Sequence, residues 1–169
     1  MDFKETVKDW IYRPELKDRL YFFTLTPERG CSKEQLQAAL ALWLRKVKQM
    51  YFGRRQQHDV FHLIMFERSH QGRLHAHVLI EDFSTLVSEK PFPVVGEFSG
   101  IAMKAWLDLD LAGKRIAQDV QKVYLHEGAL DYVLKDLWNS KNFENLPVEL
   151  LSLPPKYLTH PHVPDRDKK

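Results

Sequence analysis

FHLIMFERSHQGRLHAHVLIED, residues 61–82, is the stretch that decides the fold we predict for this chain. Val, Ile, Leu and Phe dominate both of its ends, and the polar residues 69–72 between them are typical of a turn, so the stretch predicts a β-hairpin. Because side chains alternate between the two faces of a strand, His75 and His77 share one face and Ala76 points to the other. Two imidazoles side by side on a polar face suit a metal ion.

Glu67 is the candidate third ligand, and its position depends on the length of the hairpin loop. If Gln71 and Gly72 formed a two-residue turn, Glu67 would lie opposite Ala76, on the face away from the histidines. A loop with an odd number of residues places Glu67 opposite His75 and on its face. We therefore predict a loop of three or five residues.

The other segments are assigned from their hydrophobic periodicity and from their turn residues. In chain order they are an irregular arm at 1–19 with at most a turn of helix, a strand at 20–26, a long helix that Ser32 and Gln35 cap and that runs to about 51, a loop at 83–98, a helix at 99–110, a strand at 119–125 and a helix at 129–138. These elements predict one α+β domain, with a mainly antiparallel sheet centred on the histidine strand and helices packed against it. We place this domain at 1–140 and a proline-rich tail at 141–169.

Composition sets limits on the class of protein. The chain has 169 residues, of which 44% are hydrophobic and 28% are charged, which is enough for one sizeable core. Its net charge of +2 permits a nucleic-acid partner without requiring one. A single cysteine, Cys31, excludes an intramolecular disulfide and a multi-cysteine zinc site. No membrane span or signal peptide is predicted, so we expect a soluble, cytoplasmic protein.

Three segments in this order resemble the three motifs of HUH endonucleases. They are Phe23-Thr24-Leu25-Thr26 on the first strand, His75-Ala76-His77 on the central strand, and Tyr132-Val133-Leu134-Lys135 on a following helix. The set is similar to the rolling-circle replication initiators (Rep proteins) of small phages, plasmids and single-stranded DNA viruses, in the form with one tyrosine. The resemblance spans residues 20–138, and it implies a ferredoxin-like or RRM-like core.

The resemblance also implies a mechanism. His75, His77 and Glu67 would hold Mg²⁺ or Mn²⁺, which orients and polarises the scissile phosphate. Tyr132 would be the nucleophile that forms a covalent 5′-phosphotyrosine and releases a 3′ hydroxyl, with Lys135 stabilising the phenolate or the phosphate charge. No G-x-x-x-x-G-K-[ST] motif is present, so unwinding would depend on a separate host helicase, and synthesis on a host polymerase.

The nucleophilic tyrosine could lie before or after the histidines in the sequence, and this order differs between branches of the HUH enzymes. Conjugative relaxases, another HUH branch, place the nucleophilic tyrosine ahead of the histidines, where this chain has Tyr12 and Tyr21. Neither has a lysine three residues later, so Tyr132 is the preferred nucleophile. The second H-x-H triplet, residues 160–162, contains a proline and lies in the tail, so it is not taken as a metal site.

The substrate would be single-stranded DNA or an origin hairpin, bound by a protein that we expect to be monomeric. The candidate DNA contacts are the threonines on the first strand and basic residues along the chain: Thr24, Thr26, Arg54, Arg55, Arg68, Arg73 and Lys122. Two alternatives stay open, namely a single-tyrosine HUH transposase and a non-catalytic DNA-binding module that controls replication.

Overall fold

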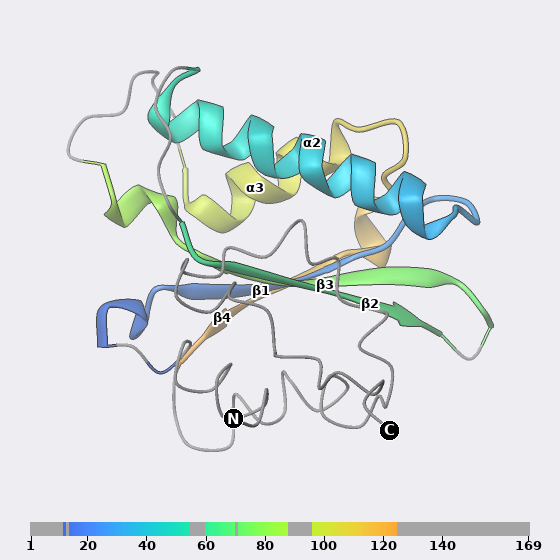
Figure 1. Ribbon diagram of the computed structural model, residues 1–169, viewed down its shortest axis with the longest axis horizontal. Helices are drawn as coiled ribbons and strands as arrows, with labels where there is room; N and C mark the ends of the chain where they lie inside the picture. Colours follow the sequence, from blue (N-terminus) through green and yellow to red (C-terminus); the bar gives the residue numbers. More distant parts are fainter. Residues whose placement is uncertain (1–11, 13, 55–59, 70, 88–95, 125–169) are drawn as a thin grey trace, which may run out of the picture.

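The computed structural model describes residues 12, 14–54, 60–69, 71–87 and 96–124 of the chain (Figure 1). In chain order the elements are η1 (Pro14–Leu16), β1 (Leu20–Leu25), α2 (Lys33–Phe52), β2 (His62–Arg68), β3 (Leu74–Glu81), η2 (Phe83–Thr85), α3 (Phe98–Leu107), η3 (Arg115–Ala117) and β4 (Asp119–Val123). The predicted helix at 129–138 and the tail at 141–169 lie outside the described residues, so the proposed domain boundary is not tested.

The four strands form one sheet in the order β2-β3-β1-β4, and every neighbouring pair is antiparallel. The described strands and α-helices follow one another as β-α-β-β-α-β, which with this strand order is the ferredoxin-like arrangement. The predicted α+β class and antiparallel sheet are therefore confirmed. The strand that carries the histidines, β3, lies between β2 and β1, as the prediction of a central histidine strand required.

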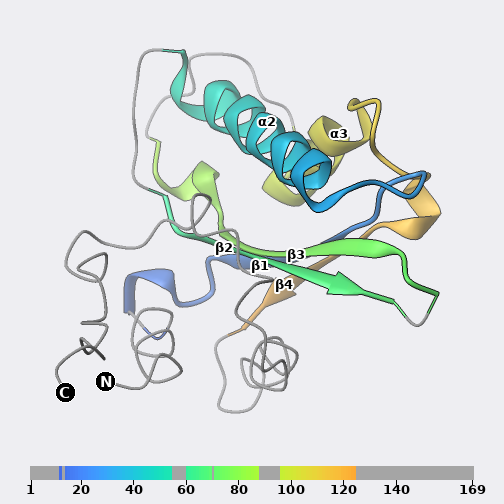
Figure 2. The same ribbon diagram turned by 45° about the vertical axis from the view of Figure 1, so that its right-hand side comes forward.

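Both α-helices pack on the same face of this sheet (Figures 1 and 2). Phe23 of β1 contacts Trp43 of α2 edge to face, with 5.7 Å between ring centroids. Trp43 also donates a hydrogen bond of 2.8 Å from Nε1 to the carbonyl of Ala102 on α3, which joins the two helices. All three side chains are fully buried, so this face of the sheet forms the larger hydrophobic core.

The caps of α2 follow the sequence prediction. Ser32 Oγ accepts from the backbone N–H of Gln35 at 3.2 Å, and Gln35 Oε1 accepts from the backbone N–H of Ser32 at 2.9 Å, which completes the predicted capping box. At the other end the helix stops at Gly53, whose φ of 78° is available to glycine without strain. The helix therefore ends one residue later than the predicted limit of about 51.

Two other boundaries differ from the predictions. The helix predicted at 99–110 begins at Phe98 and ends at Leu107, because the chain leaves helical geometry at Asp108, whose ψ is 1°. The strand predicted at 119–125 ends at Val123, because Val123 pairs with Leu20, the first residue of β1, and the β1–β4 ladder ends there. In the described part of the chain no helix is long and apolar enough to cross a membrane.

Candidate metal centre on the histidine face

The β2–β3 hairpin has the odd loop that the sequence predicted. Five residues, 69–73, separate β2 from β3, and the loop is closed by a 2.8 Å hydrogen bond from Ser69 N–H to the carbonyl of Arg73. Gly72 has a φ of 76°, a left-handed conformation that favours glycine. The resulting register pairs Glu67 with His75, so the predicted position of the acid relative to the histidines is confirmed.

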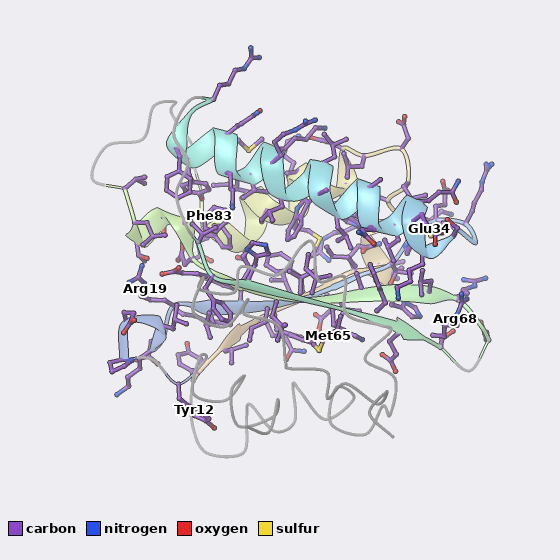
Figure 3. The ribbon with its side chains drawn as sticks, viewed as in Figure 1. Tyr12, Arg19, Glu34, Met65, Arg68 and Phe83 are labelled. Atoms are coloured by element: carbon purple, nitrogen blue, oxygen red, sulfur yellow. The ribbon has the colours of Figure 1, made fainter. Side chains whose placement is uncertain are left out.

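One face of the sheet carries the histidines and the acid, and we call it the histidine face. It is the face opposite the two helices, since directly paired residues point to the same side and their neighbours, such as Ala76, belong to the helix-side core. Figure 3 shows Met65, the partner of His77, pointing away from the helices. In the described strands this face also carries, near the histidines, Phe22, Thr24, Asp119 and Gln121.

Glu67 and His77 are in direct contact. Oε2 of Glu67 lies 2.6 Å from Nε2 of His77, which is a short hydrogen bond to a carboxylate. The Glu67 side chain is 43% exposed and that of His77 is 17% exposed. The carboxylate of Glu67 is therefore accessible to water or to a ligand, whereas the imidazole of His77 is mostly buried.

A threonine hydroxyl contacts Nδ1 of each histidine. Thr24 Oγ1 lies 3.2 Å from Nδ1 of His77, and Thr26 Oγ1 lies 3.0 Å from Nδ1 of His75. Thr24 is the residue directly opposite His77 across β1 and β3, so this contact follows from the strand register. Because both hydroxyls occupy Nδ1, Nε2 is the nitrogen of each ring that can bind a metal ion.

An aromatic contact and a lowered pKa also affect these rings. Phe22 stacks on His77, with ring centroids 5.4 Å apart and planes 8° from parallel. Burial lowers the pKa of His75, and the nearby His77 and Arg73 lower it further, while Glu67 acts in the opposite direction. The neutral imidazole that a metal ligand needs is therefore favoured at His75. Sequence analysis missed Phe22, although its two-residue spacing from Thr24 placed it on the same face.

The donor set fits a divalent cation by its chemistry, although these side chains are not arranged around an ion. Among the described residues no three His, Cys, Asp or Glu side chains are grouped closely enough to hold a metal. The contact of 2.6 Å between Glu67 and His77 is shorter than the roughly 3 Å that separates two neighbouring ligands around an octahedral ion with bonds of about 2.1 Å. A small movement of the half-exposed Glu67 would open that space, and two imidazole nitrogens with one carboxylate are a donor set that divalent metal ions accept.

The basic residues predicted to contact DNA are not all brought to this face. Arg73 is exposed in the hairpin loop and lies close enough to His75 to affect its pKa. Arg68 is exposed at the end of β2 and donates from Nη1 to the carbonyl of Gly72 at 3.1 Å, and it belongs to the helix side of the sheet because it pairs with Leu74. Among the described members of this set, Arg73 is the one whose charge affects the pKa of His75.

Two other candidate DNA contacts, Lys122 and Arg54, lie away from the histidine face. Lys122 pairs with the buried Tyr21 on the helix side of the sheet, and its ammonium lies 5.9 Å from the centroids of the Tyr21 and Tyr124 rings. Arg54 follows the C-terminus of α2, which Figure 1 places at the opposite end of the sheet from the hairpin loop. Outside the described residues are three further predicted site residues: Arg55, Tyr132 and Lys135.

Gln118 is a second residue that sequence analysis missed. It is buried immediately before β4, and its side-chain amide bonds to the backbone of Thr26, the residue that holds His75. A glutamine before a strand carries no distinctive sequence signal. Comparison of the chain with known protein families, with curated proteins and with solved structures gave no match.

Proposed function

We propose that this protein nicks and rejoins single-stranded DNA with the help of a divalent metal ion, and that it initiates rolling-circle replication. The observation that carries the proposal is the grouping of Glu67, His75 and His77 on one face of a ferredoxin-like sheet, with a threonine hydroxyl at Nδ1 of each histidine. This donor set, with both rings fixed through their other nitrogen, is the arrangement expected of metal-binding histidines.

In this proposal the described residues bind and orient the metal ion. Glu67 and the Nε2 atoms of His75 and His77 would hold Mg²⁺ or Mn²⁺, which would neutralise charge on the scissile phosphate. Thr24 and Thr26 keep the two rings in the orientation that directs Nε2 outward. The exposure of Glu67 leaves the centre open to a DNA strand from the solvent side.

Tyr132 is the proposed nucleophile. Its phenolic oxygen would attack the phosphorus, forming a phosphotyrosine bond as the bond to the 3′ oxygen breaks; the phenol loses its proton and the released 3′ oxygen gains one. Lys135, three residues later in the sequence, would stabilise the phenolate. The phosphotyrosine retains the energy of the cleaved linkage, so a free hydroxyl can later reseal the strand. The released 3′ end would prime a host polymerase.

A covalent adduct assay tests the proposal directly. Purified protein is incubated with Mn²⁺ and a pool of labelled single-stranded oligonucleotides, including candidate origin hairpins, and adducts are separated on a denaturing gel. We expect a labelled protein band that Tyr132→Phe and EDTA each abolish. The matched control is Tyr124→Phe: Tyr124 is 51% exposed and follows β4, about 17 Å along the strand from Asp119, so this variant should retain the adduct.

Three outcomes would contradict the proposal. An adduct that persists in Tyr132→Phe would exclude Tyr132 as the nucleophile. Loss of the adduct in Tyr124→Phe, with the fold intact, would assign that role to Tyr124. No adduct under any condition, for wild-type protein that binds the same oligonucleotides, would favour a DNA-binding module that controls replication.

Substitution of the histidines separates catalysis from binding. His75→Ala or His77→Ala should reduce cleavage by about a hundredfold or more, since the positioned metal would be lost. Binding of the oligonucleotide, measured by fluorescence anisotropy, should change by less than about threefold, because electrostatic and stacking contacts dominate it. An equal loss of both activities would instead indicate misfolding or a direct role of the histidines in contacting DNA.

The direct Glu67–His77 bond is the specific observation that favours a second candidate. A 2.6 Å bond of this kind also forms in a purely structural ion pair, which a non-catalytic DNA-binding module could contain. Mn²⁺ titration separates the two, because a structural pair would show no saturable binding. A transposase with one tyrosine shares the chemistry of the first proposal. Such an enzyme is expected to act as a dimer, so the molar mass of the DNA complex in solution distinguishes it from the monomeric initiator that we propose.

A further inference from the structure

Gln118 is a polar residue whose side chain is almost completely buried, with 6% of its surface exposed. Its Oε1 accepts hydrogen bonds from the backbone N–H of Thr26 at 2.8 Å and from Nε1 of Trp106 at 3.0 Å. Its Nε2 donates to the carbonyls of Thr26 at 2.8 Å and of Lys114 at 3.3 Å. All four hydrogen-bonding positions of the amide are therefore used.

Two of these hydrogen bonds fix Thr26, a residue that the β1–β4 ladder does not include. Thr26 lies one residue beyond the end of β1, and β4 begins with Asp119, whose partner is Thr24. The side-chain amide of Gln118 supplies to Thr26 one donor and one acceptor, as the backbone of a neighbouring strand would. The β1–β4 pairing is in this way extended to the residue whose hydroxyl contacts His75.

The orientation of the amide is fixed by Trp106. The indole N–H can only donate, so the atom facing it must be the carbonyl oxygen of Gln118. Trp106 is fully buried on α3, and its position is set by the helix-side core. Gln118 cannot rotate without breaking bonds to two elements at once.

Gly113 closes the other side of this arrangement. Its N–H donates to the carbonyl of Thr26 at 2.9 Å. A Cβ added at Gly113 would lie 2.6 Å from that carbonyl oxygen and 3.0 Å from Nε2 of Gln118, so only glycine fits against this backbone. Thr26 is thus enclosed by Gly113 and by Gln118.

We infer that Gln118 is a positioning residue for His75, acting through Thr26. With the Thr26 backbone fixed, its Oγ1 is held 3.0 Å from Nδ1 of His75, which orients the Nε2 atom of that ring toward the histidine face. His77 does not depend on Gln118, because its partner Thr24 is held within the ladder between β3 and β4. The inference rests on the proposed function only in that the oriented ring serves a metal ion.

Nuclear magnetic resonance of the metal-free protein tests the positioning itself. Imidazole ¹⁵N shifts are measured at pH 8 in wild type and in Gln118→Met, which preserves side-chain length but removes the four hydrogen bonds of the side-chain amide. We expect the His75 shifts to move toward the average of the two tautomers, while those of His77 stay unchanged. The matched control is Gln121→Met, on the exposed part of β4, where the amide bonds only with Asp119 among the contacts described, at 2.7 Å. In this control neither ring should change.

Unchanged His75 shifts in folded Gln118→Met would overturn the inference, as would equal shifts at both histidines. If Gln118→Met fails to fold, Gln118→Glu and Trp106→Phe are measured instead. The carboxylate of Gln118→Glu still accepts from Thr26 and Trp106 but cannot donate to the Thr26 carbonyl, and Trp106→Phe removes the bond that orients the amide. Each should shift His75 alone, and no shift in either folded variant would equally overturn the inference.

Mn²⁺ binding gives the second readout and separates the two ideas. We expect Gln118→Met to weaken Mn²⁺ about tenfold, as loss of outer hydrogen-bonding partners does at metal sites. If wild type binds no Mn²⁺, the proposed function fails, while the NMR comparison still decides whether Gln118 orients His75. If wild type binds Mn²⁺ and Gln118→Met binds it equally well, the positioning role for the metal fails.

Discussion

Oε2 of Glu67 lies 2.6 Å from Nε2 of His77, although the residue directly opposite Glu67 in the hairpin is His75. The carboxylate therefore reaches diagonally across the strand pair, over a separation that long side chains can bridge. The acid thus contacts His77 and is paired through the backbone register with His75. Because the three side chains come from a single hairpin, the geometry of the candidate centre depends on one local register.

Glu67→Gln should separate metal binding from stability. The amide keeps the size of the side chain but lacks its charge, so Mn²⁺ affinity should fall by about tenfold or more. Because the Glu67 side chain is 43% exposed, the free energy of unfolding should change by less than about 1 kcal/mol. Calorimetric Mn²⁺ titration and urea unfolding measure the two quantities. Glu28→Gln, an exposed residue beyond β1, removes the same charge and should affect neither; unaltered Mn²⁺ affinity in Glu67→Gln would remove this acid from the centre.

Thr24→Val tests the hydroxyl beneath His77. Valine keeps the β-branched shape that suits a strand, so the sheet should be retained while the 3.2 Å contact to Nδ1 is lost. We expect Mn²⁺ affinity to fall about tenfold. Thr24→Ser, which retains the hydroxyl, should bind Mn²⁺ within about threefold of wild type. Equal affinities in the valine and serine variants would show that the hydroxyl has no part in metal binding.

Gly113→Ala should destabilise the protein. The new Cβ would lie 2.6 Å from the carbonyl oxygen of Thr26, a backbone atom that cannot move without disturbing the Gln118 hydrogen bonds. We expect a loss of about 1–3 kcal/mol in the free energy of unfolding, the usual range for overpacking. Gly30→Ala meets no atom within 4 Å and should change stability by less than about 1 kcal/mol. Urea unfolding compares the two variants. Similar unfolding midpoints would mean that the backbone around residue 113 adjusts to the added Cβ without loss of stability.

Tyr51 should make stability fall at alkaline pH. Burial, and secondarily the carboxylate of Asp82, raise the pKa of Tyr51 to about 12. This folded-state pKa is above the unfolded value near 10. The protonated Tyr51 side chain therefore contributes fully to the free energy of unfolding below pH 10, and this contribution is lost as the pH rises toward 12. The stability lost over this range should be about 3 kcal/mol. Tyr51→Phe should flatten this alkaline decline in urea unfolding, and an unchanged decline would assign it to other groups.

The α+β class and the histidine hairpin could be predicted from the sequence because the patterns that indicate them are local. Alternation along residues 61–82 predicted the hairpin, and the Ser32–Gln35 pair predicted the start of α2. The odd loop could be chosen only by requiring Glu67 to share a face with His75, an assumption about chemistry that the register then matched. Helix and strand ends were less predictable, because they depend on tertiary partners such as the Leu20–Val123 pair.

The candidate site was predictable where residues share a strand or are joined by a single hairpin. His75 and His77 could be placed on one face from their spacing alone, and Thr24 and Thr26 from theirs. Gln118 could not be found in this way, because its contact with Thr26 joins residues 92 positions apart and depends on the β1–β4 register. Lys122 was proposed as a DNA contact from its charge, which does not predict the face of β4 that it occupies; the register places it on the helix side.

The two strands that carry the candidate centre should differ in how readily they open, because β3 lies inside the described sheet and β2 lies at its edge. His75 and His77 are on a strand that has hydrogen-bonded neighbours on both sides, whereas β2, which carries Glu67, is the outermost strand of the described sheet on that side. Outer strands open by local fluctuations that leave interior strands closed, so amide protons of β2 should exchange with solvent sooner than those of β3. We therefore expect Glu67 to be the more mobile part of the candidate centre, and the two imidazoles the more rigid part.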